Sequence, residues 1–192
     1  MPNKILKIIT IENKRDAKFL RQKTANFDFK THSTSSGLKY SRKEIAELIK
    51  QMREAMRQAQ GVGLSANQVG LDLRFFVAQI PQTQMNTDKN TDEHGYSGKF
   101  YTIFNPEIIK FSKEKDVIEE GCLSVPEVSG LVQRPEKITL IGQDKNGKKI
   151  KIKAWGILAR IFQHEIDHLN GILFIDRTKK VYKLSKEKQQ IL

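Results

Sequence analysis

The stretch Gln163-His164-Glu165-Ile166-Asp167-His168 decides how the rest of the chain is interpreted. It lies within Trp155 to Leu169, where apolar residues recur with a helical period, and Asn170-Gly171 follows as a helix end. Two His residues four positions apart lie about 40° apart around a helix, so both project from one face. Glu165 can flank the same point. The pattern predicts a metal-binding pair beside a general base, although such residues also occur on solvated helix faces.

A catalytic metal site needs a third protein ligand. After His168 the chain contains no His, and its carboxylate side chains there are Asp176 and Glu187. The single Cys of the chain, Cys122, lies upstream and directly follows Glu119-Glu120-Gly121. Neighbouring carboxylates disfavour a thiolate, but a bound divalent metal stabilises it. Cys122 is therefore either an inert buried residue or the third ligand of a tetrahedral site with one open position.

The segments around this helix predict the fold class. Ser41 and Glu44 form a capping-box pattern before a helical period that reaches Ala59, and Gly61 is expected to end that helix in the left-handed conformation. Short runs rich in β-branched and aromatic residues predict strands at 73–80, 100–105, 117–118, 138–141 and 150–153. Strands and helices do not alternate as βαβ units. We expect an α+β protein with mainly antiparallel strands packed around the central helix that carries the HExxH motif.

Two dipeptides predict where strands end. Asn105-Pro106 is expected to stop the strand that begins at Phe100, because proline has no N–H to donate to a sheet. Asn146-Gly147 lies between the last two predicted strands and is typical of a tight β-hairpin turn. The two strands on either side of it should therefore pair antiparallel.

Length and composition indicate the class of protein. The chain has 192 residues and a hydrophobic fraction of 38%, which fits one globular domain spanning residues 1–192. A polar surface loop is expected at about 82–99 and a basic segment at about 177–192. No window reaches the ~18 apolar residues of a membrane span, and no signal-peptide pattern is present. We therefore expect a cytoplasmic protein without a membrane partner.

The formal net charge of +12 needs its own explanation. The basic excess lies in residues 1–60 and 141–192, whereas 61–140 carries more acidic than basic side chains. A basic surface fits a nucleic-acid, ribosomal or anionic-membrane partner, but no known nucleic-acid-binding motif is present. The segment from Arg177 to Leu192 contains six basic residues and one acidic residue. It is either a solvated helix or tail, or a docking segment.

Three motifs together resemble those of the peptide deformylase family. Residues 61–68 (GVGLSANQ), 120–124 (EGCLS) and 163–168 (QHEIDH) match its three motifs in order, and Arg134-Pro135 lies at the expected distance after Cys122. The resemblance covers roughly residues 40–175. Ser65 stands where the family usually has Ala, and we expect this exchange of small residues to be harmless.

The resemblance implies a function and a metal centre. Cys122, His164 and His168 would bind one Fe²⁺, with Zn²⁺, Ni²⁺ or Co²⁺ as substitutes. The metal-bound water would attack the formyl carbon of an N-formylmethionyl peptide and release formate. Glu165 would serve first as general base and then as general acid.

The resemblance also assigns supporting residues. The Gln68 side-chain amide and the Leu123 backbone N–H would stabilise the oxyanion. Gly63 would let the peptide approach closely, and Glu120 and Arg134 would pair near the mouth of the site. Asp167 is expected to lie behind the ligands or on the helix surface. The apolar candidates for a methionine pocket are Val62, Ile118, Ile157 and Ile161.

Two other functions remain open at this point. A zinc peptidase with an HExxH motif would use a ligand after His168 and would not need Cys122. A basic RNA- or ribosome-binding protein would keep the metal site only as a structural feature. The second function is compatible with deformylation, because the segment 177–192 could dock the enzyme on ribosomal RNA.

Overall fold

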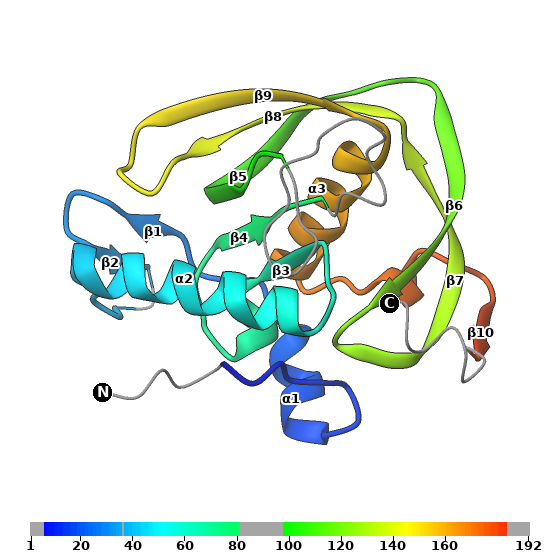
Figure 1. The fold of residues 1–192 in the computed structure, drawn as a ribbon, viewed down its shortest axis with the longest axis horizontal. Coiled ribbons are helices and arrows are strands. Elements are labelled where there is room, and N and C mark those ends of the chain that lie inside the picture. The colour runs from blue at the N-terminus through cyan, green and yellow to red at the C-terminus, as the bar shows by residue number, and fades with distance from the viewer. Residues whose placement is uncertain (1–5, 36, 81–97, 184–192) are drawn as a thin grey trace.

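A computed structural model describes residues 6–35, 37–80 and 98–183 of the chain (Figure 1). Its centre is the helix α3 (Gly156–Leu169), which packs against an antiparallel sheet with the strand order β3-β4-β5-β8-β9. These strands are β3 (Gly63–Ser65), β4 (Phe75–Ala78), β5 (Tyr101–Phe111), β8 (Lys137–Gln143) and β9 (Lys149–Trp155). The expected α+β class, with antiparallel strands around the motif-bearing helix, is confirmed.

A second sheet lies beside the end of α3 (Figure 1). It has the order β10-β7-β6 and consists of β6 (Lys115–Cys122), β7 (Val125–Pro135) and β10 (Val181–Lys183), all antiparallel. The remaining elements are α1 (Lys14–Leu20), α2 (Arg42–Gln58), the short hairpin β1 (Phe27–Asp28) and β2 (Ser33–Thr34), and the 3₁₀ helices η1 (Ala66–Val69) and η3 (Phe174–Asp176). Among the described residues, no helix is both long and apolar enough to cross a membrane.

The five-stranded sheet separates two hydrophobic clusters. On one face, Phe76 and Leu140 belong to the cluster around α3. On the other face, Phe75 and Phe104 stack at 4.5 Å between ring centroids, in the cluster that includes α2. Because α3 is covered by the sheet along most of its length, its motif residues are held on a nearly rigid support.

The helix α2 begins as predicted and ends differently. The side chain of Ser41 accepts from Glu44 N and the Glu44 carboxylate accepts from Ser41 N, so the capping box is present. The left-handed residue after the helix is Gln60, with φ 55°, and not Gly61. Gly61 has no left-handed φ, and a Cβ there would lie 2.7 Å from the terminal methyl Leu123 Cδ1, which would have to shift. The prediction that Gly61 ends this helix in the left-handed conformation was therefore wrong.

The prediction that a strand stops at Asn105-Pro106 was also wrong, because β5 continues to Phe111. Asn105 adopts φ 46°, and the register with β8 shifts between Phe104 and Glu107, which marks a β-bulge. The Asn105 side chain stabilises the bulge by bonding to the backbone of Phe27 and to the Gln143 side chain. A bulge tolerates a proline because its residues are not all paired in the ladder.

The hairpin and the last helix are confirmed. The strands β8 and β9 pair in continuous register, and Gly147 in the turn adopts φ 81°. The helix α3 ends at Asn170, with Gly171 at φ 75°. Of the expected loop at 82–99, residues 82–97 lie outside the described residues, and so do residues 184–192 of the basic segment.

Candidate active site

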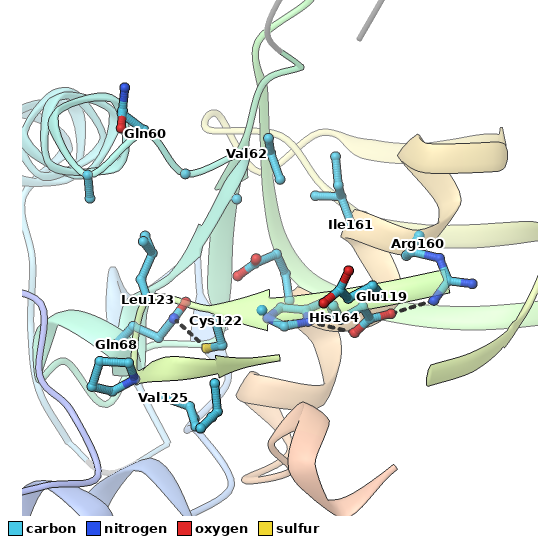
Figure 2. A pocket seen from close by; sticks show the side chains of 18 of the residues that line it. Gln60, Val62, Gln68, Glu119, Cys122, Leu123, Val125, Arg160, Ile161 and His164 are labelled. Carbon is cyan, nitrogen blue, oxygen red and sulfur yellow. Dashed lines mark hydrogen bonds and ion pairs between the residues drawn. The ribbon is translucent and has the colours of Figure 1, made fainter. Parts of the chain in front are cut away.

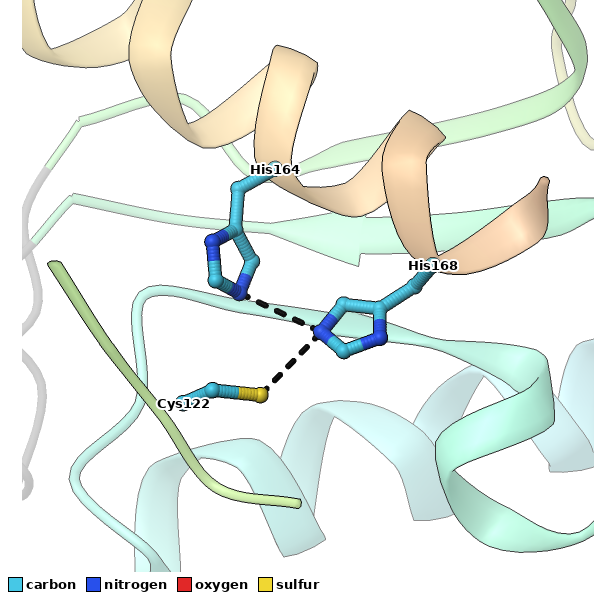
Figure 3. Close-up of side chains that lie close together, drawn as sticks. All are labelled: Cys122, His164 and His168. Carbon is cyan, nitrogen blue, oxygen red and sulfur yellow. Dashed lines mark hydrogen bonds between the residues drawn. The ribbon is translucent and has the colours of Figure 1, made fainter. Parts of the chain in front are cut away.

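Three ligand-type atoms meet between α3 and the end of β6 (Figure 3). Cys122 Sγ lies 3.1 Å from His168 Nε2, which lies 3.2 Å from His164 Nε2. All three ligand atoms lie within 4.8 Å of one another. The helix supplies both imidazoles from successive turns. The thiol comes from the end of β6, because Cys122 lies 42 residues before His164 and 46 residues before His168 in the sequence. The set consists of one cysteine sulfur and two imidazoles, which fits a catalytic divalent metal with an open position.

The protonation of the two His residues supports the same interpretation. Burial alone would lower the pKa of His164, but hydrogen bonds to Cys122 and Glu120 outweigh it and raise the pKa to about 10. Burial and the positive charge of His164 hold the pKa of His168 well below its usual value. The Cys122 and Glu120 side chains thus favour a positive charge at His164, which lies between them. A divalent ion would satisfy this environment as a proton does.

Glu120 orients one of the imidazoles. Its Oε2 lies 3.0 Å from His164 Nδ1, which leaves His164 Nε2 directed at Cys122 and His168. A carboxylate on the far nitrogen of a metal-binding His fixes its tautomer and its ring orientation. Burial opposes the charge of Glu120, but hydrogen bonds from His164 and Arg134 outweigh it and hold its pKa well below the usual value.

A buried network of charges extends behind the ligands. Arg134 Nε and Nη2 donate to the Glu120 carboxylate at 2.6 and 2.9 Å, and Arg134 Nη1 donates to Asp167 at 2.7 Å. Arg160 Nη1 donates to Glu120 at 2.6 Å and Arg177 donates to Asp167. Glu120 and Arg134 were expected to pair near the mouth of the site; they do pair, but both are buried, and only Glu120 reaches the wall of the cavity described below. Asp167 lies behind the ligands, which is one of the two positions expected for it from the sequence.

Sequence reasoning missed Arg160. It is 6% exposed, and besides Glu120 it donates to the backbone oxygens of Val132 and Asp116. It therefore joins α3 to the sheet β10-β7-β6. The available signal was its position four residues before His164, which places both side chains on one face of the helix.

Replacing Glu120 by Gln should lower the stability of the metal-free protein by about 3 to 5 kcal/mol, because two buried guanidinium groups would lose their common counter-ion. The free energy of unfolding in urea measures this loss. Glu119→Gln is the matched control, since Glu119 is the exposed preceding residue and accepts from Ser129 Oγ at 2.5 Å. Equal losses in both variants would contradict the buried-network explanation.

Glu165 is 3% exposed and is held from β3. Ser65 Oγ lies 2.6 Å from its Oε2 and 2.9 Å from its main-chain oxygen, so the hydroxyl donates to this residue. A Cβ on Gly63 would lie 2.3 Å from Glu165 Oε1, so Gly63 leaves the space that the carboxylate occupies. Burial raises the pKa of Glu165 to about 7. Ser65 was expected to be a harmless exchange for Ala, yet its hydroxyl contacts the carboxylate of the HExxH motif.

Gln68 reaches the site from η1. Its Oε1 accepts from Ser65 N at 2.9 Å, and its Nε2 lies 3.1 Å from Ser124 Oγ and 3.7 Å from Cys122 Sγ. The amide nitrogen is therefore fixed and directed toward the ligands (Figure 2). The neighbouring Asn67 Nδ2 donates to His168 O at 2.6 Å and so braces the second half of the His pair.

A cavity of about 500 Å³ opens above these residues (Figure 2). Its wall includes Gly63, Gln68, Glu120, Cys122, Leu123, His164 and Glu165, which are seven of the nine residues assigned to the site. His168 and Arg134 lie behind it. Val62, Ile157 and Ile161 also line the cavity, whereas Ile118, the fourth apolar candidate, does not and is 41% exposed. The site thus combines an apolar hollow with a buried carboxylate and a set of metal ligands.

Comparison with known proteins gives one consistent family. A family model described as polypeptide deformylase matches residues 5–184. A peptide deformylase of Halothermothrix orenii is 45% identical over 139 residues, which cover 72% of this chain and 80% of the relative. The crystal structure of peptide deformylase from Thermotoga maritima superposes with a TM-score of 0.71 at 30% identity, over 92% of this chain and 99% of that one. A peptide deformylase structure from Synechococcus elongatus in complex with actinonin has a TM-score of 0.71 at 30% identity, over 91% and 79% of the two chains.

Proposed function

The chain belongs to the peptide deformylase family, whose members are metal-dependent enzymes acting on formylated peptides, and we propose that it removes the formyl group of the initiator formylmethionine from nascent chains in the cytoplasm. The observation that supports this most strongly is the meeting of Cys122, His164 and His168 beside the buried Glu165, at the base of an apolar cavity. We treat residues 1–192 as a single catalytic domain.

The proposed metal ligands are Cys122, His164 and His168, and the proposed ion is Fe²⁺, which Zn²⁺, Ni²⁺ or Co²⁺ could replace. When bound, such an ion would supply Lewis-acid chemistry, lowering the pKa of a water and polarising the formyl carbonyl. The side chains of Cys122 and Glu120, which favour a positive charge on His164, and the His164 Nε2 that faces His168, support this ligand set.

Glu165 is the proposed general base and general acid. Its carboxylate would take a proton from the attacking water and return it to the leaving amine, which yields formate and a free N-terminus. A pKa raised to about 7 by burial suits a group that must both accept and donate a proton near neutral pH. Gly63 leaves room for this carboxylate, and Ser65 holds one of its oxygens.

Gln68 and Leu123 are the proposed oxyanion donors. The Gln68 amide is held by Ser65 and Ser124, so it needs little reorganisation when charge develops on the formyl oxygen. Leu123 follows Cys122 directly and lines the cavity, which supports its backbone N–H as the second donor. The two donors come from different elements and would approach the oxyanion from two directions.

The methionine side chain would occupy the apolar part of the cavity formed by Val62, Ile157 and Ile161. Gly63 and Glu120 lie on the cavity wall and remain proposed substrate contacts, whereas Arg134 would act through Glu120 rather than on the peptide. This division follows from the burial of Arg134, which is 3% exposed.

Replacing Ser65 by Ala should lower kcat about 5- to 30-fold and leave KM nearly unchanged, because a lost hydrogen bond to a charged group is worth about 1 to 2 kcal/mol. The fold should tolerate the change, since Ala is smaller. Steady-state formate release measures kcat and KM. Ser129→Ala serves as the control, because Ser129 is a buried serine whose hydroxyl donates to Glu119 and contacts neither Glu165 nor Gln68. An unchanged kcat in Ser65→Ala would mean that the hydroxyl does not position the carboxylate.

The decisive experiment is anaerobic purification, metal analysis and a coupled formate assay on a formyl-Met tripeptide. The expected result is one Fe²⁺ per chain, stoichiometric formate, and no cleavage of the same peptide without its formyl group. Actinonin, which is bound in the S. elongatus relative, should compete with the peptide. Cleavage of a peptide bond in the unformylated peptide would favour the zinc-peptidase alternative.

We also propose that the basic segment 177–192 contacts the ribosome. Arg177 is occupied by Asp167, whereas Lys179, Lys180 and Lys183 are exposed, so these lysines would share this contact with residues 184–192. Deleting residues 184–192 leaves the Arg177–Asp167 pair and the pairing of β10 with β7 in place and should reduce co-sedimentation with ribosomes. Unchanged co-sedimentation would remove this proposal without affecting the proposed reaction.

A further inference from the structure

The strand β9 carries a row of lysines that the reaction does not use. Lys149, Lys151 and Lys153 alternate with Ile150, Ile152 and Ala154, and all three lysines are exposed. Successive side chains of a strand point to opposite faces, so these lysines share one face of the sheet. Their apolar neighbours face the cluster around α3. The lysines therefore project from the opposite face.

The pairing register extends this row across the sheet. Lys153 lies opposite Thr139, which lies opposite Lys110 on β5, and Trp155 lies opposite Lys137. Directly paired residues point to the same face of a sheet. We call this surface the β9 lysine face, and it consists of Lys110, Lys137, Lys149, Lys151, Lys153 and Trp155.

The β9 lysine face is open to solvent. The helix α2 packs on the same side of the sheet but contacts β3 and β4, at the other end of the strand order (Figure 1). All five lysines are exposed, and Trp155 is 70% exposed. Trp side chains are highly buried on average, so an indole this exposed is unusual.

The charge on this face is unbalanced. Its register includes one carboxylate, Glu107, opposite Ile141. Within the described part of the chain, no ion pair joins any of the five lysines to a carboxylate. Acidic side chains gather at one end, where Asp116 and Glu114 raise the pKa of Glu136 close to Lys137. The positive field is therefore strongest along β9 itself.

The β8–β9 turn borders a separate hollow of about 310 Å³. Arg42, Lys145 and His32 line it together with Phe29 and Asn146. His32 Nδ1 is buried and has no hydrogen-bond partner among the described residues. The two cations Arg42 and Lys145 favour an oxyanion as the group that would enter this hollow.

We propose that the β9 lysine face binds the phosphate backbone of single-stranded RNA. A row of cations on an exposed strand neutralises successive phosphates, and Trp155 at its end offers a ring on which an unpaired base can stack. This surface lies on the side of the sheet away from α3, so RNA bound there leaves the cavity of the proposed reaction open.

An edge strand gives these lysines a second physical role, because β9 ends the strand order β3-β4-β5-β8-β9. Charged side chains protect an edge strand from pairing with another molecule. Lys→Glu replacements preserve that protection, because Glu is also charged, but they reverse the attraction to phosphate. Charge reversal therefore separates RNA binding from protection of the edge.

The test uses the full chain and a fluorescein-labelled, mixed-sequence 20-nucleotide single-stranded RNA, with binding measured by anisotropy at several salt concentrations. The variant is Lys149→Glu/Lys151→Glu/Lys153→Glu. The control is Lys14→Glu/Lys43→Glu/Lys50→Glu, which has the same net charge and changes exposed lysines on or next to helices. Lys→Gln replacements at the three β9 positions provide a second variant if the first does not fold.

We expect the β9 variant to bind RNA about tenfold or more weakly, with a salt dependence reduced by about 2 in log–log slope, and the control to lose far less. Trp155→Ala should weaken single-stranded binding about fivefold or more. Formate release should be unchanged in all variants. Equal losses in the β9 variant and the control would overturn the proposal. A β9-specific loss of binding to phosphatidylserine vesicles without loss of RNA binding would also overturn it, in favour of a membrane.

Discussion

Replacing Glu165 by Gln should lower the turnover of formyl-Met peptides by a factor of about 10² to 10⁴, the usual contribution of a positioned general base. Gln is nearly isosteric with Glu but cannot accept a proton from water and return it to the amine. Its amide oxygen can still accept the Ser65 hydroxyl, so the side chain should stay in the space that Gly63 leaves. KM should change little, because the cavity wall keeps its shape.

Metal content is the second readout for Glu165→Gln. Glu165 is not among the three residues whose ligand atoms cluster, so the variant should keep as much metal as the unaltered enzyme. Asp167→Asn is the matched control, since Asp167 lies on the same helix but contacts Arg134 and Arg177 instead of the site. It should lower stability more than turnover. A Glu165→Gln enzyme that kept more than a tenth of its turnover would exclude this residue as the base.

The parts of the site that the sequence predicted depend on local geometry. His164 and His168 share a face because four residues make slightly more than one helical turn, whatever surrounds the helix. The capping box at Ser41 and the turn at Asn146-Gly147 are also local, and both are present. Cys122 became a candidate because the chain has one Cys and because its flanking residues match a family motif.

The parts that could not be predicted depend on contacts between distant segments. Ser65 and Glu165 are 100 residues apart, and nothing in the sequence indicates that the hydroxyl would meet the carboxylate. Arg160 stands in a helix whose sequence is mostly apolar, and its partner Glu120 lies 40 residues earlier in the sequence, on β6. The β5 bulge has the same origin, because Asn105 keeps its left-handed conformation through Phe27, 78 residues away.

Where the positive charge gathers on the folded surface also could not be predicted from the sequence. The basic excess after residue 140 suggested the segment 177–192 as the docking region. The structure places three of these lysines in one row on β9, and it joins Arg177 to the buried Asp167. Alternation along a strand was visible in the sequence, but whether that face is covered depends on where α2 packs.

Replacing Cys122 by Ser should lower the affinity of the site for Zn²⁺ or Co²⁺ by more than about 100-fold, because even residues that only orient metal ligands contribute 10- to 100-fold. Serine keeps the size of the side chain and removes the thiolate. The unfolding temperature of the metal-free protein should change little, since Cys122 is half-buried and Sγ is held mainly by His168 and the Ser124 N–H. Metal bound per chain after dialysis against a chelator measures the effect.

Ser124→Ala is the control for Cys122→Ser, because it removes a neighbouring hydroxyl without removing a ligand. A Co²⁺-loaded protein adds a second readout, since a thiolate ligand gives a charge-transfer absorption that Cys122→Ser must lose. Asp176 cannot easily replace the thiol, because its carboxylate is bound to Arg21 and to Leu173 N. If Cys122→Ser nevertheless held one ion tightly, the ligands would be those of an HExxH peptidase, and cleavage of unformylated peptides would become the expected activity.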